Sequence, residues 1–217
     1  MSAPKIAYIA QGPGFSGEHD LVGLLEARGF SVEFFSLNHG FNKVDPGRLA
    51  AADLVLLRGP WRLSLEEAVL SRMLAHQLKK IIGGRDVNDR QRMVGIGRGA
   101  MVLIKSLPGR FPSDLTFTWS EAFKDKVPWI RTYLRGTDSN FSYTLSESLP
   151  VFDDPSERLQ PWIGSEHGTC GWHVDSRIFF SFLDPFGFRD PRQLRSYGFE
   201  DLSTAVKIDK VLDSVLV

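Results

Sequence analysis

The stretch "MVGIGRGAMVL", Met93 to Leu103, joins an apolar strand-like segment to an apolar helix-like segment through a run of glycines. Many α/β enzymes place a nucleophile in such a turn, where its side chain projects above the sheet at the amino end of the helix. The turn needs small flanking residues because its backbone is strained, and Gly95 and Gly99 meet that need. The central position is Gly97, which has no side chain, and Arg98 follows it. The sequence therefore predicts the shape of a nucleophile site without a nucleophile.

Apolar runs elsewhere in the first half alternate with segments of helical spacing, which predicts a mostly parallel sheet with helices on both faces. From Leu107 onward the sequence becomes rich in proline and aromatic residues and predicts antiparallel additions to this sheet. A buried strand and a helix close the chain. Besides the strand at 93–97, we expect strands at 5–10, 31–37, 52–59 and 177–185, and helices at 16–29, 64–82 and 200–216.

Length and composition predict one α/β domain over residues 1–217. Lysine plus arginine and aspartate plus glutamate number 26 each, so no overall charge favours nucleic acid or an acidic membrane surface. No apolar run approaches the roughly 20 residues of a membrane helix. The start, "MSAPKIAYIAQ", is typical of a strand rather than a signal peptide, and a single cysteine excludes an internal disulfide. We therefore expect a cytoplasmic protein.

An ordered series of motifs resembles the class I glutamine amidotransferases, and most closely the glutaminase domain or subunit of phosphoribosylformylglycinamidine synthase. The elbow of that family is G-x-C-x-G. "DLVLLRGPW" is similar to the strand that ends in the family's P-G-G-F oxyanion loop, and "SLPGRFPSDLTFTW" follows its leucine-proline-glycine turn. "PWIGSEHGT" loosely resembles its H-G-E-G segment, and "FFSFLDPFGF" stands where the family has M-P-H-P-E. The resemblance implies a flavodoxin-like fold.

The same resemblance implies a degenerate catalytic site. Gly97 stands where the family has its thiol nucleophile, Asp184 where it has the general-base histidine, and Phe186 where it has the orienting glutamate. In the oxyanion loop, Gly59 is followed by Pro60, which has no backbone N–H to donate. Thiol-imidazole chemistry needs an attacking sulfur and a proton shuttle. We therefore expect no glutaminase activity.

A second group of reactive side chains falls in "EHGTCGWHVD", Glu166 to Asp175, which we interpret as one loop. His167, Cys170 and His173 are residue types that bind zinc, so a hydrolase that uses this loop, with or without a metal, stays an alternative. Their spacing matches no standard zinc motif, and Cys170 neither follows a strand nor begins a helix. We predict no metal and no other cofactor.

Two arginines are predicted at the carboxyl ends of parallel strands, where open α/β sheets bind ligands. Arg98, at the start of a helix, has the geometry to hold a carboxylate or phosphate, so a sensor of a small anion is another alternative. We favour instead a vacated pocket filled by the protein, with Arg98 or Arg58 directed toward Asp184. The predicted function is that of a non-catalytic subunit or binding module beside a synthetase-like partner, related to purine biosynthesis.

Overall fold

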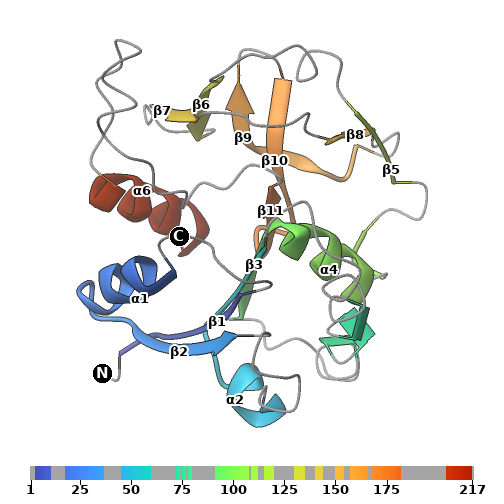
Figure 1. The fold of residues 1–217 in the computed structure, drawn as a ribbon. Coiled ribbons are helices and arrows are strands. Elements are labelled where there is room, and N and C mark those ends of the chain that lie inside the picture. Colours follow the sequence, from blue (N-terminus) through green and yellow to red (C-terminus); the bar gives the residue numbers. More distant parts are fainter. Residues whose placement is uncertain are drawn as a thin grey trace.

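The computed structural model describes residues 3–10, 18–36, 45–59, 72–73, 75–76, 78–79, 91–107, 109–111, 115–119, 130–134, 140–143, 150–153, 157–165, 168–181 and 204–216. These residues contain a nine-stranded sheet, a two-stranded sheet and helices packed against the larger sheet (Figure 1). Five neighbouring strands of the larger sheet are parallel: β2 (Ser31–Ser36), β1 (Lys5–Ala10), β3 (Leu54–Gly59), β4 (Arg92–Gly97) and β11 (Ile178–Ser181).

Antiparallel strands continue the same sheet beyond β11. In spatial order they are β10 (Gly168–Val174), β9 (Gln160–Ser165), β6 (Ile130–Leu134) and β7 (Asn140–Tyr143). A separate antiparallel pair is formed by β5 (Thr116–Trp119) and β8 (Pro150–Asp153). If β11 is counted as the fifth parallel strand, the parallel part has the order 2-1-3-4-5, which is the flavodoxin-like order. The predicted fold class, with antiparallel additions in the second half, is confirmed.

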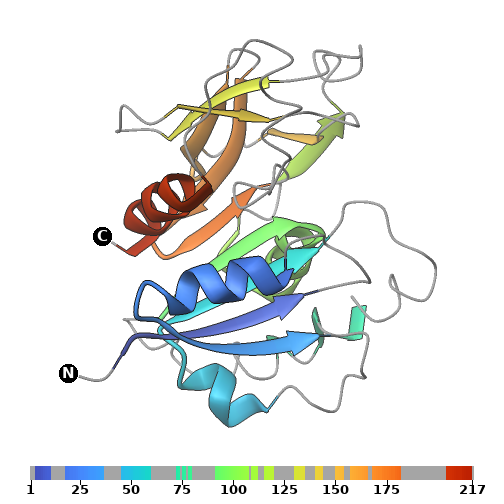
Figure 2. The same cartoon turned by 60° about the vertical axis from the view of Figure 1, so that its left-hand side comes forward.

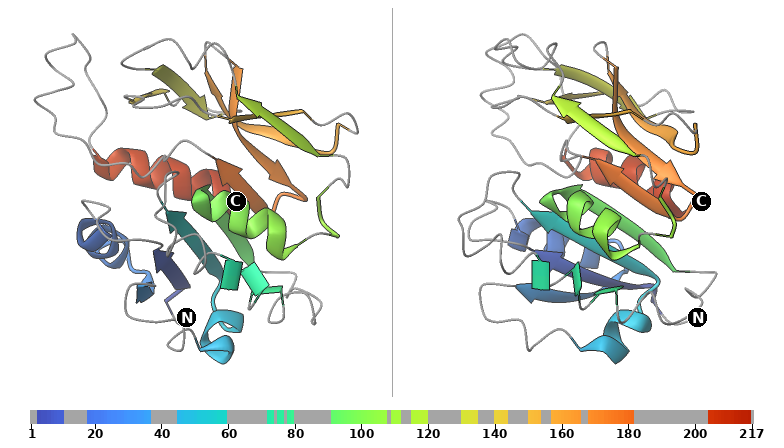
Figure 3. Two further views of the ribbon diagram at one scale, coloured as in Figure 1. Left: turned by 45° about the vertical axis from the view of Figure 1, so that its right-hand side comes forward. Right: turned by 90° about the vertical axis from the view of Figure 1, so that its right-hand side faces the viewer.

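Helices lie on both faces of the parallel part (Figures 1 and 3). On one face are α1 (Glu18–Glu26) and α6 (Thr204–Leu216), and Arg28, two residues after α1, forms an ion pair with Asp209 of α6. On the other face is α4 (Arg98–Ser106), which packs against β3, β4 and β11. The Ser106 hydroxyl of α4 donates to the Val102 carbonyl at 2.7 Å and lies 3.3 Å from the carbonyl oxygen of Ala75, which is itself helical. A short helix, α2 (Pro46–Ala50), lies near the edge strand β2 (Figure 2).

The central strands are buried along their whole length because both faces are covered. All six residues of β3 are buried, and so are five of the six in β1 and in β4. Such strands are nearly continuous apolar runs rather than alternating ones. This is the pattern that allowed their prediction from sequence. None of the described helices is long and apolar enough to cross a membrane.

The assignment of Glu166–Asp175 to one loop is wrong. Residues Gly168–Val174 form β10, which pairs with β9 on one side and β11 on the other. The alternating pattern of a strand is hidden by two glycines and by register shifts against β9 between Thr169 and Trp172. Gly171 lies close to β9, since a Cβ atom there would be 3.1 Å from the Ile163 side chain. Only Asp175 of the described part of this segment lies in a turn.

Candidate functional site

The strand-to-helix turn at Gly97 is the feature around which a site is built. Gly97 ends β4 and is also the N-cap of α4, which begins at the next residue. Its backbone has φ 59° and ψ −123°, a combination that L-residues adopt only under strain. Glycine adopts it freely because it has no Cβ. The turn therefore has the sharp geometry of a nucleophile elbow, and it is occupied by the residue that holds this geometry at least cost.

The two flanking glycines let α4 approach the sheet closely. A Cβ atom on Gly99 would be 2.2 Å from the carbonyl oxygen of Leu57 in β3, and one on Gly95 would be 2.8 Å from the Cα of Ala100 in α4. Both distances are far shorter than a van der Waals contact. The expected need for small residues on either side of the turn is confirmed, and its cause is direct packing of helix backbone on strand backbone.

The strand similar to the family's oxyanion strand lies beside the elbow. Gly59, the last residue of β3, is the register partner of Gly97. The residues that resemble two separate parts of the family's site are thus neighbours in space. Pro60 follows Gly59 directly but lies outside the described residues.

The strand that leads to Asp184 runs to the same edge of the sheet. β11 is parallel to β4, and its last residue, Ser181, pairs with Ile96. The predicted arrangement of these two strands is confirmed. Asp184 and Phe186 themselves lie outside the described residues, so their positions stay predictions.

Arg58 is an interior side chain. It is 1% exposed, and its Nη1 donates to the Tyr8 hydroxyl of β1 at 3.2 Å. Sequence analysis did not identify Tyr8, although a tyrosine within the apolar run "KIAYIA" is a signal that a polar group needs a partner there. Arg98, by contrast, is half-buried and is the first residue of α4.

Cys170 and His173 lie on β10 and are not part of the elbow. Cys170 is buried, and this burial raises the pKa of its thiol to about 11, an effect that a hydrogen bond with Ser165 partly opposes. The ring of His173 stacks on Phe179 with centroids 5.3 Å apart, and burial lowers its pKa. Its buried Nδ1 atom has no partner among the described residues. In the part of the chain that is described, no three His, Cys, Asp or Glu residues are grouped to hold a metal, and His167 lies outside it.

Comparison with solved structures identifies the fold, whereas neither protein-family models nor curated protein sequences match the chain. The chain resembles a glutamine amidotransferase from Thermotoga maritima with a TM-score of 0.62 and 15% identity, over 100% of this chain and 96% of that one. It resembles a GMP synthase subunit from Thermoplasma acidophilum with a TM-score of 0.61 and 13% identity, over 97% and 92% of the two chains.

A third similar structure is PurLQS from Thermotoga maritima, with a TM-score of 0.56 and 17% identity, over 99% of this chain and 98% of that one. All three likenesses extend over nearly the whole of both chains, so they concern the complete architecture rather than one motif. At these identities they establish the fold alone. The chain has the fold of the class I glutamine amidotransferases.

Proposed function

We propose that this chain is a glutamine amidotransferase-like protein without glutaminase activity, which serves as a binding module for a synthetase-like partner. The observation that carries the proposal is Gly97, which occupies the elbow with no side chain to attack a glutamine amide. The single cysteine, Cys170, does not substitute for it, because it is buried in β10 and burial raises its thiol pKa to about 11.

Partner binding is the role that this architecture can keep when catalysis is absent. The packing of α4 on β3 and β4 through Gly95 and Gly99 stabilises the fold whether or not a nucleophile is present. Likeness to PurLQS supports a place beside a phosphoribosylformylglycinamidine synthase-like partner in purine biosynthesis. Purification of the untagged protein from its own cell extract, followed by mass spectrometry of stoichiometric companions, tests this. Recovery of the chain alone would contradict the proposed role.

The direct test of the catalytic proposal is ammonia release from L-glutamine. We expect no release above a buffer control from the purified protein, alone or with its partner. Activity in the unaltered chain would contradict the proposal, and its loss in Cys170→Ser would then identify the responsible thiol. A known active amidotransferase assayed in parallel is the control for the measurement.

Stepwise restoration of the site gives a sharper prediction. Gly97→Cys alone should give a thiol that alkylating reagents modify but no turnover, because nucleophile, proton shuttle and oxyanion hole act as a unit. Adding Asp184→His and Phe186→Glu should give weak or no turnover, since Pro60 still lacks an N–H donor of a kind typically worth about 3 kcal/mol. Activity should improve when Pro60→Gly is added. Full turnover by Gly97→Cys alone would contradict this account.

We also propose that the vacated site is closed by an ion pair between Asp184 and Arg58 or Arg98. Arg58 and Ser181 flank Ile96 on its two neighbouring strands, so their Cα atoms are two strand spacings apart, roughly 9–10 Å. Asp184 follows Ser181 by three residues. A buried guanidinium such as that of Arg58 is costly unless a counter-charge is near.

This pairing predicts the effect of removing the carboxylate. Asp184→Asn should lower the free energy of unfolding by about 3 kcal/mol, because it leaves a buried cation without its counter-ion. The double variant Arg58→Met/Asp184→Leu should recover part of that loss, and urea unfolding measures both. If Arg98 is the partner, recovery should appear with Arg98→Met instead. Additive losses in both double variants would contradict the ion pair.

A further inference from the structure

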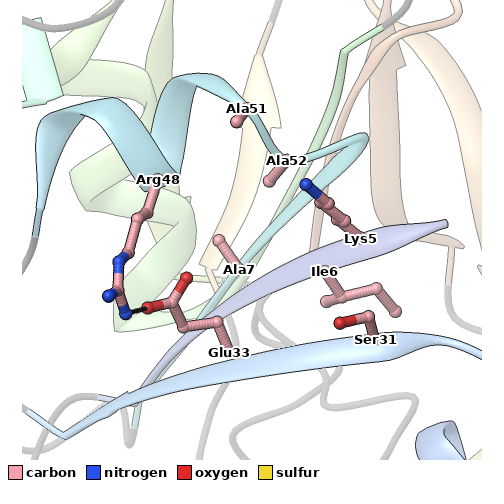
Figure 4. Close-up of a pocket in the computed structure, with 8 residues that line it drawn as sticks. All are labelled: Lys5, Ile6, Ala7, Ser31, Glu33, Arg48, Ala51 and Ala52. Carbon is pink, nitrogen blue, oxygen red and sulfur yellow. Dashed lines mark hydrogen bonds and ion pairs between the residues drawn. The ribbon is translucent and has the colours of Figure 1, made fainter. Parts of the chain in front are cut away.

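A pocket of about 310 Å³ lies at the opposite end of the sheet from the elbow (Figure 4). We call it the amino-edge pocket, because it is formed by the first residues of β1, by β2 and by α2 with the turn after it. The lining residues are Lys5, Ile6, Ala7, Ser31, Glu33, Arg48, Ala51 and Ala52. Gly97 is the last residue of β4, parallel to these strands, so the amino-edge pocket and the elbow are separate sites.

Small side chains create the hollow. Ala7 on β1 faces α2, where Ala51 and Ala52 follow the helix (Figure 4), and none of the described residues places a large side chain between them. Larger residues lie on opposite sides of this alanine-lined centre, with Lys5 on one side and Arg48 on the other. The pocket therefore has an apolar middle and polar ends, which is the usual arrangement of small-molecule sites.

The two cations of the pocket differ in their ion pairs: Arg48 has acidic partners, whereas Lys5 has none among the described residues. Arg48 forms an ion pair with Glu33 across the pocket wall, and its Nε lies 3.7 Å from Asp45 Oδ2. The hydrogen bond and the charge of Glu33 raise the pKa of Arg48. Arg48 and Glu33 thus neutralise each other and are held in place.

Lys5 is the uncompensated charge. Its backbone N–H donates to Asp53 Oδ2 at 2.8 Å, but within the described residues its ammonium group makes no ion pair. Ser31 is the register partner of Lys5 on β2, whereas the Lys5 side chain extends toward Ala52 (Figure 4). The lining residues Lys5, Glu33 and Arg48 together carry one net positive charge, and Lys5 is the one of them that makes no ion pair among the described residues.

We propose that the amino-edge pocket binds a small organic monocarboxylate, with the carboxylate at the Lys5 ammonium and the apolar part against the three alanines. Lys5, whose ammonium makes no ion pair among the described residues, matches a single negative charge. A dianion such as phosphate fits poorly, because Glu33 lines the same pocket and Asp53 lies beside Lys5. The alanine side chains have no polar group to bind phosphate oxygens, whereas burial against them removes an alkyl chain from water, which is favourable.

The test is a titration of the whole chain, labelled with ¹⁵N, followed by NMR at constant ionic strength. The probes are acetate, propionate and butyrate, with sodium chloride as the salt control and inorganic phosphate as the competing anion. We expect saturable shifts at the amides of Ala7, Ser31, Ala51 and Ala52 that strengthen with chain length. The absence of saturable shifts, shifts confined to other residues, or tighter binding of phosphate than of propionate would each overturn the proposal.

Three variants distinguish the pocket from general charge effects. Lys5→Gln should weaken propionate binding about fivefold or more, since one close ion pair in water is lost while the backbone bond to Asp53 remains. Ala51→Leu should abolish binding by filling the hollow, and the exposed position of Ala51 leaves the core intact. Lys105→Gln, which removes an exposed lysine of α4, is the matched control and should have no effect. Equal binding by all three variants would overturn the assignment.

Discussion

At the scale of single residues, the backbone of Gly97 decides what this position can hold. Its φ of 59° with ψ −123° is unfavourable for any residue with a Cβ. Gly97→Ala should therefore lower the free energy of unfolding by about 1–3 kcal/mol, measured by urea denaturation. A nucleophilic side chain at this position would carry that strain, whereas glycine does not.

A second glycine provides the matched control for this prediction. Gly23 is exposed in α1, has no atom within 4 Å of a built Cβ, and needs no unusual backbone. Gly23→Ala should stabilise the protein by about 0.5–1 kcal/mol, because alanine favours the helix. Effects of the same sign and size at both positions would mean that the elbow backbone is not strained.

At the scale of elements, the hairpin between β10 and β11 places two ordinary residues in left-handed backbone. Asp175 and Ser176 have φ values of 55° and 52°. They are the central residues of a turn closed by the Arg177 N–H, which donates to the Val174 carbonyl at 3.3 Å. Turns with positive φ at both central positions favour Asn-Gly or Asp-Gly, because glycine carries no penalty there. Ser176→Gly should raise the free energy of unfolding by about 1 kcal/mol, measured in urea. Ser176→Ala, which keeps a Cβ, should give no such gain, and a gain from alanine would point to another cause.

Some strands of the sheet could be predicted from the sequence and others could not. β1, β3 and β4 were predictable because burial on both faces demands continuous apolar runs such as "LVLLRG". β10 was missed because its glycines and its irregular pairing with β9 erase the alternation on which strand prediction depends. At the candidate site, the elbow followed from its glycine spacing. The contact of Arg58 with Tyr8 did not, since it joins strands far apart in the sequence.

At the scale of the whole molecule, one ion pair links the two helices that cover a single face of the sheet. Arg28 Nη2, beyond the end of α1, donates to Asp209 Oδ2 of α6 at 3.1 Å, and a second bond joins Nε to Oδ1. These hydrogen bonds and the guanidinium charge lower the pKa of Asp209 from its ordinary 3.8. The unfolded chain therefore takes up this proton more readily than the folded one. The stabilisation is fully present above pH 3.8 and is lost as the pH falls through the lowered value.

Asp209→Asn should accordingly lower the free energy of unfolding at neutral pH by about 0.5 kcal/mol, a modest amount because the carboxylate is half exposed. The difference from the unaltered protein should shrink as the pH falls below the pKa of Asp209. Asp213→Asn is the control, since Asp213 is exposed on the same helix and has no ion pair in the described part of the chain. An equal effect of both variants would contradict the bridge.

The strand order has a consequence for synthesis on the ribosome. In the finished sheet β4 lies between β3 and β11. β3 is translated before β4, but β5 to β10 are translated between β4 and β11. Until residue 181 emerges, the nascent chain carries β4 as an open edge without its native neighbour, and such an edge is a template for wrong pairing. The turn at Gly97 is at the end of β4, so it would also form before β11 is present. The nascent chain is thus most in need of a chaperone while β5 to β10 are being made, and slowing translation there should increase aggregation.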